Sequence, residues 1–350
     1  MKKLLLGTTA LVLLSGAAGA QQVTTSSPFT VTLGGSVRYD FSFFDEDVSE
    51  VNRESRIDTR IFLKAEAKAD NGLTYGFDSR IRTASASAGI GSQAMIMDYK
   101  YVYAKGAWGT VNLGDYYGAA TALEVVAPTV GIGQADLAAF ANAGNASLFW
   151  ASEDTPVTKI TYLTPSFAGF QAGVSYTPEQ DSGRFITKGG QRFRDVVEVA
   201  GQYAGEFGPV GVTVGGGYEF GQSSTGLGDY EIWNAGAQVA FYGFTVGASY
   251  YDNGEVGYNA ATPAGSIDQQ HSWAFGATYA AGPFGVGASY VRTTSQEAVS
   301  NDDFVDQVYG VGGAYKLAPG LSLQGDINYI DAETVDNKGW QVVLRTRVDF

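Results

Sequence analysis

The residues best suited to act on a charged solute are seven arginines near the two ends of the 350-residue chain. Each falls on the polar side of a segment in which polar and apolar residues alternate: Arg38, Arg56, Arg60, Arg80, Arg82, Arg345 and Arg347. Three acids begin or lie within a long segment that has no lysine or arginine: Asp115, Glu124 and Asp136. A guanidinium stays charged and is weakly hydrated. Cations facing anions across a narrow water-filled gap create a field that selects among solutes.

The composition gives little support to catalysis. There is no cysteine and His271 is the only histidine, so disulfides, thiolate chemistry and multi-histidine metal sites are excluded. Residues 89–94 match G-x-G-x-x-A but lack a βαβ context, and neither a P-loop nor a G-x-S-x-G motif is present. A hydrolase would need His271 as its base. We therefore expect a protein that is not an enzyme. The net charge of −14 separately argues against nucleic acid as a partner.

Residues 1–20 predict a cleaved secretory signal peptide. Lys2 and Lys3 precede an apolar stretch, residues 4–14, that is too short to span a bilayer. Small residues at 18–20 fit a cleavage site that leaves Gln21 first, and loss of the two lysines takes the net charge from −14 to −16. No later segment has the roughly 18 consecutive apolar residues of a membrane helix. The sequence thus predicts an exported protein in which residues 21–350 form one domain.

The exported part reads as sixteen strands joined by turns and loops. We expect them at residues 30–43, 54–68, 73–83, 95–104, 109–115, 157–164, 169–177, 194–206, 212–220, 231–241, 244–252, 270–280, 284–294, 305–317, 321–330 and 340–350. Seven connections are short turns and eight are longer polar loops, and the two kinds alternate. This pattern is typical of an all-β, transmembrane, 16-stranded antiparallel up-and-down β-barrel with external loops on one side. A soluble sandwich would need Greek-key crossovers.

Aromatic residues near the ends of these strands predict the girdles that mark membrane interfaces. On the apolar side of the alternation they include Tyr39, Phe41, Phe43, Tyr99, Tyr101, Tyr103, Tyr203, Tyr218, Phe220, Tyr279, Phe284 and Tyr329.

Residues 116–147 form the longest connection and interrupt the strand pattern. A structureless segment of this length is usually functional in a compact fold. We predict that it folds into the space that the barrel encloses. Glycines on the inner side of the later strands either leave room for this loop or a wide lumen, or ease strand curvature. They are Gly215, Gly217, Gly236, Gly247, Gly276, Gly285, Gly287, Gly310 and Gly312.

Residues 159–178 read KITYLTPSFAGFQAGVSYTP. With the leader, the sixteen strands, the long third external loop and the terminal Phe350, this run resembles the general diffusion porins of Gram-negative outer membranes, in their alphaproteobacterial branch. The resemblance covers residues 21–350. It implies an outer-membrane location, a homotrimer, and in each barrel a water-filled pore narrowed by the third loop.

In a closed barrel the last strand pairs with the first, so the arginines gather on one wall. Arg38, Arg60 and Arg345 are then near mid-height, at the predicted depth of the loop, and the other four lie close by. We predict a pore constriction between this basic wall and the acids Asp115, Glu124 and Asp136. The alternative is structural: the arginines pair with acids on neighbouring strands, namely Asp40, Asp58, Asp78 and Asp326.

Two acidic clusters offer oxygen ligands to a hard cation: Asp45, Glu46 and Asp47, and Asp302, Asp303 and Asp306. Either could bind Ca²⁺ or bridge divalent ions to lipopolysaccharide. The simpler interpretation is a solvated acidic rim, because neither cluster has the ligand spacing of a dedicated calcium loop. We expect no other cofactor.

We therefore predict a porin that passes small hydrophilic solutes and ions passively, with weak cation selectivity because acids at the mouth concentrate cations. A channel selective for sugars or anions is one alternative. A row of lumen aromatics would favour it, and Phe62 and Tyr251 alone do not form a row. A non-conducting structural barrel, or an enzymatic one that uses His271, is the other alternative.

Overall fold

The structure is a computed structural model that describes residues 21–24, 28–48, 51–83, 95–132, 143–146, 156–180, 193–261 and 266–350. The predicted signal peptide and Asp136 lie outside the described residues.

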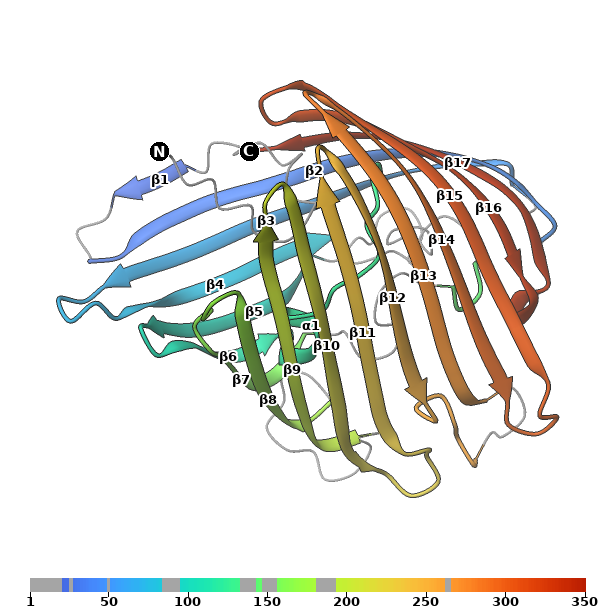
Figure 1. The fold of residues 1–350 in the computed structure, drawn as a ribbon, viewed down its shortest axis with the longest axis horizontal. Coiled ribbons are helices and arrows are strands. Elements are labelled where there is room, and N and C mark those ends of the chain that lie inside the picture. The colour runs from blue at the N-terminus through green and yellow to red at the C-terminus, as the bar shows by residue number, and fades with distance from the viewer. Residues whose placement is uncertain are drawn as a thin grey trace.

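Sixteen long strands of the described chain form one closed antiparallel barrel (Figure 1). They are β2 (Thr30–Glu46), β3 (Arg53–Lys68), β4 (Thr74–Thr83), β5 (Met95–Gly106), β6 (Gly109–Tyr116), β7 (Val157–Leu163), β8 (Phe170–Glu179), β9 (Phe193–Phe207), β10 (Val210–Ser223), β11 (Tyr230–Phe241), β12 (Phe244–Gly254), β13 (Ile267–Ala281), β14 (Phe284–Glu297), β15 (Asp303–Ala318), β16 (Leu321–Ala332) and β17 (Asn337–Asp349). Each strand pairs with the next, and β17 pairs with β2 from Gly339↔Glu46 to Asp349↔Ser36. The predicted fold is confirmed.

The alternation of each strand gives the barrel two unlike faces. On β13, Trp273 and Phe275 are 46% and 47% exposed, whereas Ser272 and Ala274, which alternate with them, are 0% exposed. Successive side chains of a strand point to opposite faces, so one set must face outward. Outward-facing apolar side chains are what a barrel needs in a lipid bilayer.

Aromatic rings form two belts on the outer face. At the end that carries the long loops, Trp233 and Tyr250 have ring centroids 4.7 Å apart, and ring contacts continue strand by strand to Trp340. At the end that carries the short turns, Phe244 lies 4.5 Å from Tyr279. The predicted girdles are therefore present. Tyr99, Tyr101 and Tyr103 do not belong to them, because they lie on the inner face.

A seventeenth strand, β1 (Gln21–Thr24), was not expected from the sequence. It pairs with β2 from Gln21↔Leu33 to Thr24↔Thr30. The end of β17 lies next to it on the same edge of β2, where Phe350 and Gly35 exchange backbone hydrogen bonds of 2.8 and 3.0 Å. Because β2 extends past the end of β17, β1 covers backbone groups that would otherwise form an open edge. Four residues are too few for alternation to reveal a strand.

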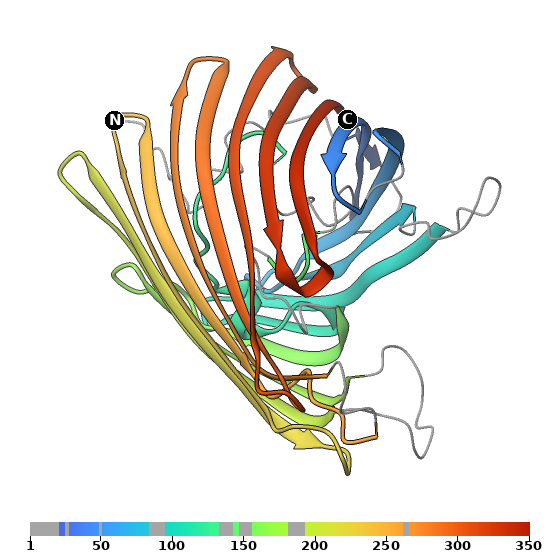
Figure 2. The same ribbon diagram turned by 90° about the vertical axis from the view of Figure 1, so that its right-hand side faces the viewer.

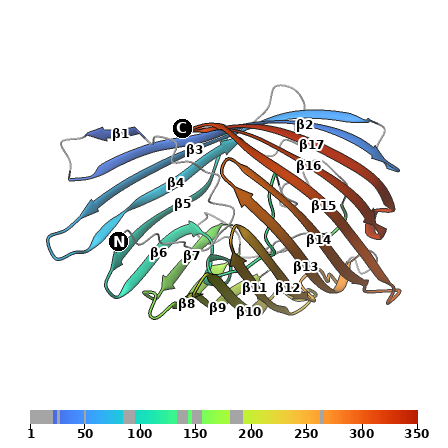
Figure 3. The ribbon, with the colours of Figure 1, turned by 45° about the horizontal axis from the view of Figure 1, so that its top comes forward.

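The longer described part of the loop, residues 117–132, follows the inner side of the later strands (Figures 2 and 3), and residues 143–146 pack against β15 and β16. It begins with the short helix α1 (Ala119–Ala122). A single 3₁₀ turn, η2 (Glu333–Val335), joins β16 to β17. None of the helices described here has the length and apolarity that crossing a membrane requires.

Candidate functional site

Asp40 on β2 joins two of the predicted arginines on the inner face. Arg345 donates to its two carboxylate oxygens from Nε at 2.5 Å and from Nη2 at 2.9 Å. Arg56 on β3 donates from Nε at 3.0 Å. The Asp40 side chain is fully buried and that of Arg345 is 3% exposed. This carboxylate therefore links β2, β3 and β17, the strands that carry Asp40, Arg56 and Arg345.

Asp58 on β3 makes a second group of the same kind. Arg38 donates from Nε at 3.0 Å and also from Nη2, and Arg60 donates from Nε at 3.2 Å. The hydroxyl of Thr83 on β4 donates to the other oxygen at 3.0 Å. Asp58 thus holds two guanidinium groups side by side at mid-wall.

Asp98 on β5 makes the third group. Arg80 donates to it from Nε at 2.8 Å and also from Nη2, while the Nε of Arg82 lies 2.5 Å from the same carboxylate. Arg80 pairs with Tyr99 but Ile81 pairs with Met97, so Asp98 is the extra residue of a β-bulge. The bulge turns its side chain inward beside the arginines.

The two interpretations of the arginines are therefore both partly right. Asp40 and Asp58 pair with them as the structural alternative expects, Asp98 serves Arg80 and Arg82 in place of Asp78, and Asp326 instead holds the loop. The three groups contain six arginines and three aspartates, a formal excess of three positive charges. Arg347 stands apart, since its guanidinium pairs with Asp349 on its own strand at 2.8 Å. We name the six arginines of the three groups the arginine wall.

The structure contradicts the prediction for Asp115 and leaves Asp136 untested. Asp115 shares the outward register of Leu113, which is 44% exposed, and it contacts Lys100 and Thr158 rather than the lumen. The strand was expected to end at this residue, so alternation could not reliably predict which face the Asp115 side chain lies on. Glu124 is half-buried, between Leu123 and Val125 whose side chains are buried against the wall. Its role in a constriction stays a prediction.

The sequence analysis missed a set of tyrosines on the inner face. Tyr99, Tyr101 and Tyr103 follow one another along β5, with ring centroids 6.1 Å apart at each step. Tyr116 of β6 lies 4.1 Å from Tyr101 and 5.7 Å from Tyr99. We name these four residues the tyrosine row. They were expected to face lipid, but the bulge at Asp98 shifts the register by one residue, which moves every following side chain to the other face.

The inner side of the barrel holds the loop through hydrogen bonds to the loop backbone. Ser175 and Glu198 accept hydrogen bonds from the amides of Ala119 and Ala120 at 3.2 and 3.1 Å. Further along the loop, four more bonds of this kind follow, each to a different strand: Gln202 Nε2 to the Leu123 carbonyl at 3.2 Å, Gln238 Nε2 to the Val126 carbonyl at 2.7 Å, Ala127 N to Ser249 Oγ at 3.1 Å and Ile132 N to Asp326 Oδ1 at 3.1 Å. Backbone groups of a loop need such partners when they are buried.

Glycines make the space in which the loop lies. They come in register pairs or near-pairs on neighbouring strands: Gly215↔Gly236, Gly247↔Gly276 and Gly287↔Gly312. A Cβ on Gly236, Gly276 or Gly312 would coincide with the carbonyl of Val125, Pro128 or Val130, respectively. At these positions the prediction that glycine leaves room for the loop is confirmed.

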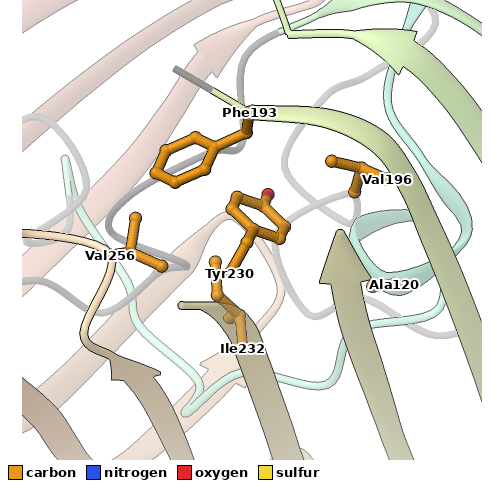
Figure 4. Close-up of a cluster of buried hydrophobic side chains, with 6 residues drawn as sticks. All are labelled: Ala120, Phe193, Val196, Tyr230, Ile232 and Val256. Atoms are coloured by element: carbon orange, nitrogen blue, oxygen red, sulfur yellow. The ribbon is translucent and has the colours of Figure 1, made fainter. Parts of the chain in front are cut away.

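The first turn of the loop is anchored by an ion pair and an apolar cluster. Lys159 on β7 lies 2.9 Å from Glu198 on β9, and both side chains are at most 5% exposed. Ala120 of α1 packs against a cluster that also contains Phe193, Val196, Tyr230, Ile232 and Val256 (Figure 4). The helix is thereby fixed to β9 and β11 at the start of the loop.

The remaining predicted sites have other environments. His271 is stacked on Tyr250 in the outer aromatic belt, with centroids 6.1 Å apart, so it does not face the lumen. The Glu46 carboxylate accepts a hydrogen bond from Asn337 at 3.1 Å, and Asp306 accepts from Thr334 and from the amide of Asn145. Among the described residues, no three His, Cys, Asp or Glu side chains are grouped as a metal site requires. Calcium binding at Asp45, Glu46 and Asp47 stays a prediction.

Comparison with known proteins agrees with this architecture. Residues 7–335 match the model of the Gram-negative porin family. A mutant of the Rh. blastica porin has the same fold at 17% identity and a TM-score of 0.61, over 91% of this chain and 100% of that one. A porin refined at 1.8 Å resolution gives 23% identity and 0.63 over the same shares. The trimer form of OmpT from Vibrio cholerae gives 15% and 0.61, over 92% and 99%. No curated protein sequence matches.

The family match spans most of the chain, and the structural likeness shows a shared barrel. The described strands cross the outer membrane of a Gram-negative bacterium many times, and the channel that they enclose serves passive diffusion rather than catalysis. This chain belongs to the Gram-negative porin family.

Proposed function

We propose that this porin works as a homotrimer in which each pore is narrowed between the loop and the arginine wall. The observation that carries the proposal is the place that the loop reaches at Ile132. Ile132 packs against Phe44 of β2 and Val343 of β17, the strands that also carry Arg38 and Arg345. The loop therefore reaches from the inner-face glycines of β10 to β15 to the arginine wall. Small hydrophilic solutes would pass between them, and Glu124 and Asp136 would supply the opposing negative charge.

Weak cation selectivity is the finer part of this proposal. The net charge is −14, and exposed acids lie in external connections or at the adjoining strand ends, at Asp45, Asp47, Asp302 and Asp303. Such a rim concentrates cations near the mouth. It also offers carboxylates through which divalent ions could bridge to lipopolysaccharide, or through which Ca²⁺ could bind. The arginine wall acts in the opposite direction, which is why we expect the selectivity to be weak.

A polar row on the outer face supports assembly into trimers. Ser79, Lys100, Asp115 and Thr158 are register neighbours across β4 to β7. An ion pair that faced lipid would be costly, whereas a subunit interface can satisfy it. The trimer form of the structurally similar OmpT is consistent with this role.

Single-channel recording of refolded protein, without residues 1–20, in a planar bilayer tests the proposal. We expect conductance steps that arrive in threes, and a small reversal potential of cation-selective sign under a KCl gradient. Single steps would contradict the trimer, and an anion-selective sign would contradict the preference. Inserted protein without conductance would contradict the open pore.

A further inference from the structure

The tyrosine row lies on the inner face together with the arginine wall. Tyr103 donates from its hydroxyl to Glu66 at 2.7 Å, and Gly76 between them leaves the space for its ring. Glu66 shares its face of β3 with Arg60 of the arginine wall and with Asp58, to which Arg60 donates. Tyr101 pairs with Gly114, and Gly114 with Lys159, whose partner Glu198 holds α1. All four rings therefore belong to the face that the loop also lines.

The residues of the row differ in exposure from the inner tyrosines at the external ends of β11 and β12. All four members of the row are partly exposed. Tyr230 and Tyr251, by comparison, are each 1% exposed. Packing of the wall accounts for a buried ring, but it does not require four partly exposed rings in contact on a water-facing surface. Such a row gives a solute a continuous series of aromatic contacts along the strand, in which neighbouring rings of β5 are tilted by 49–53°.

Charged groups stand at the two ends of the row and differ in balance, and Asp78 pairs in register with Tyr101 between them. At the external end, the Arg80 guanidinium lies 4.7 Å from the centroid of Tyr99, and Arg80 and Arg82 share Asp98. At the other end, the Lys64 ammonium lies 5.5 Å from Tyr103 and is paired with Glu66 at 2.8 Å. The external end has two cations for one acid, whereas the other end has one cation and one acid. A bound anion is therefore favoured at the external end.

We propose that the tyrosine row and Arg80 form a binding track for solutes that combine a ring with a carboxylate, such as a sugar acid or an aromatic acid. The apolar face of the ring would stack on the tyrosines. The carboxylate would meet the planar, bidentate donors of Arg80 and Arg82. This inference rests on the proposed open pore. Solutes of this class would pass faster or be held longer in the channel, and other solutes would still pass.

The test is current blockade in single channels carrying KCl. Glucuronate and benzoate probe the two kinds of ring acid, while gluconate and acetate supply the carboxylate without a ring. We expect concentration-dependent interruptions with at least one ring acid and none with the acyclic acids. Blockade by glucuronate alone assigns the track to sugar acids, and blockade by benzoate alone to aromatic acids. Equal responses to all four acids, or no response, would overturn the track.

Substitutions then locate the binding. Tyr101→Leu keeps an apolar side chain but removes the ring, and should weaken blockade about three- to tenfold. Tyr101→Phe keeps the ring and should retain the blockade, while Arg80→Gln should weaken blockade by the ring acids. Tyr309→Leu, on the outer face, is the matched control and should match the unsubstituted protein. Unchanged blockade in Tyr101→Leu would overturn the track while KCl conductance still supports the pore. Absence of KCl conductance in the inserted, unsubstituted protein would instead overturn the pore, and the track with it.

Discussion

Arg345 and Asp40 form a bidentate pair across the seam where the last strand of the barrel meets β2. The two residues are 305 positions apart in the chain, and both side chains are almost fully buried. Two parallel charge-assisted hydrogen bonds fix geometry as well as energy. The same pair therefore closes the barrel and sets the position of a cation on the lumen wall.

Replacing Asp40 by Asn should destabilise the barrel. The substitution leaves Arg345 and Arg56 near one another without the carboxylate that both contact, and breaking a buried ion pair typically costs about 3 kcal/mol. We expect the free energy of unfolding in guanidinium, measured in detergent by heat-modifiable gel migration, to fall by about this amount. Asp45→Asn, on the same strand but exposed, is the matched control. Equal losses in the two variants would contradict the role of the seam pair.

Removing positive charge from the arginine wall should shift ion preference toward cations. The triple variant Arg38→Gln, Arg60→Gln and Arg345→Gln removes three of the six positive charges while the three aspartates remain. The reversal potential under a KCl gradient should move in the cation-selective direction, and more at low ionic strength, since screening weakens charge effects. Arg347→Gln is the control, because Arg347 pairs with Asp349 outside the three groups. A triple variant with the reversal potential of the control would exclude these arginines from the constriction.

The close contact between the inner-face glycines and the loop allows a steric test. A methyl group at Gly236 would coincide with the carbonyl of Val125, so Gly236→Ala must push the loop off the wall and into the pore. We expect a lower single-channel conductance. Gly211→Ala is the control, because a Cβ there has only an ordinary contact of 3.8 Å with Ala240. Equal conductance in the two variants would mean that the loop does not limit the current.

Most of the barrel and much of the wall could be predicted because alternation has a period of two and the lumen is polar. Six of the seven arginines gather as expected, since each strand between them keeps its register. The prediction failed on β5, where the bulge at Asp98 adds one residue and changes which side chains face inward. Tyr99, Tyr101 and Tyr103 fit a lipid-facing girdle equally well, so composition could not reveal the slip.

The position of Asp115 leads to a test of assembly. Asp115 contacts Lys100 and Thr158 on the outer face, in a polar row that would be costly in lipid. Asp115→Asn should leave Lys100 without its counter-charge at the proposed subunit interface and so weaken the trimer. The measurement is the temperature at which trimers dissociate on unheated gels, which we expect to fall. Asp252→Asn is the matched control, because Asp252 accepts from Tyr250 at 3.0 Å on the outward register of β12, six strands away. If both variants dissociate at the temperature of the unsubstituted protein, the trimer must form through another face, and the ion pair of Lys100 and Asp115 must be tolerated in lipid.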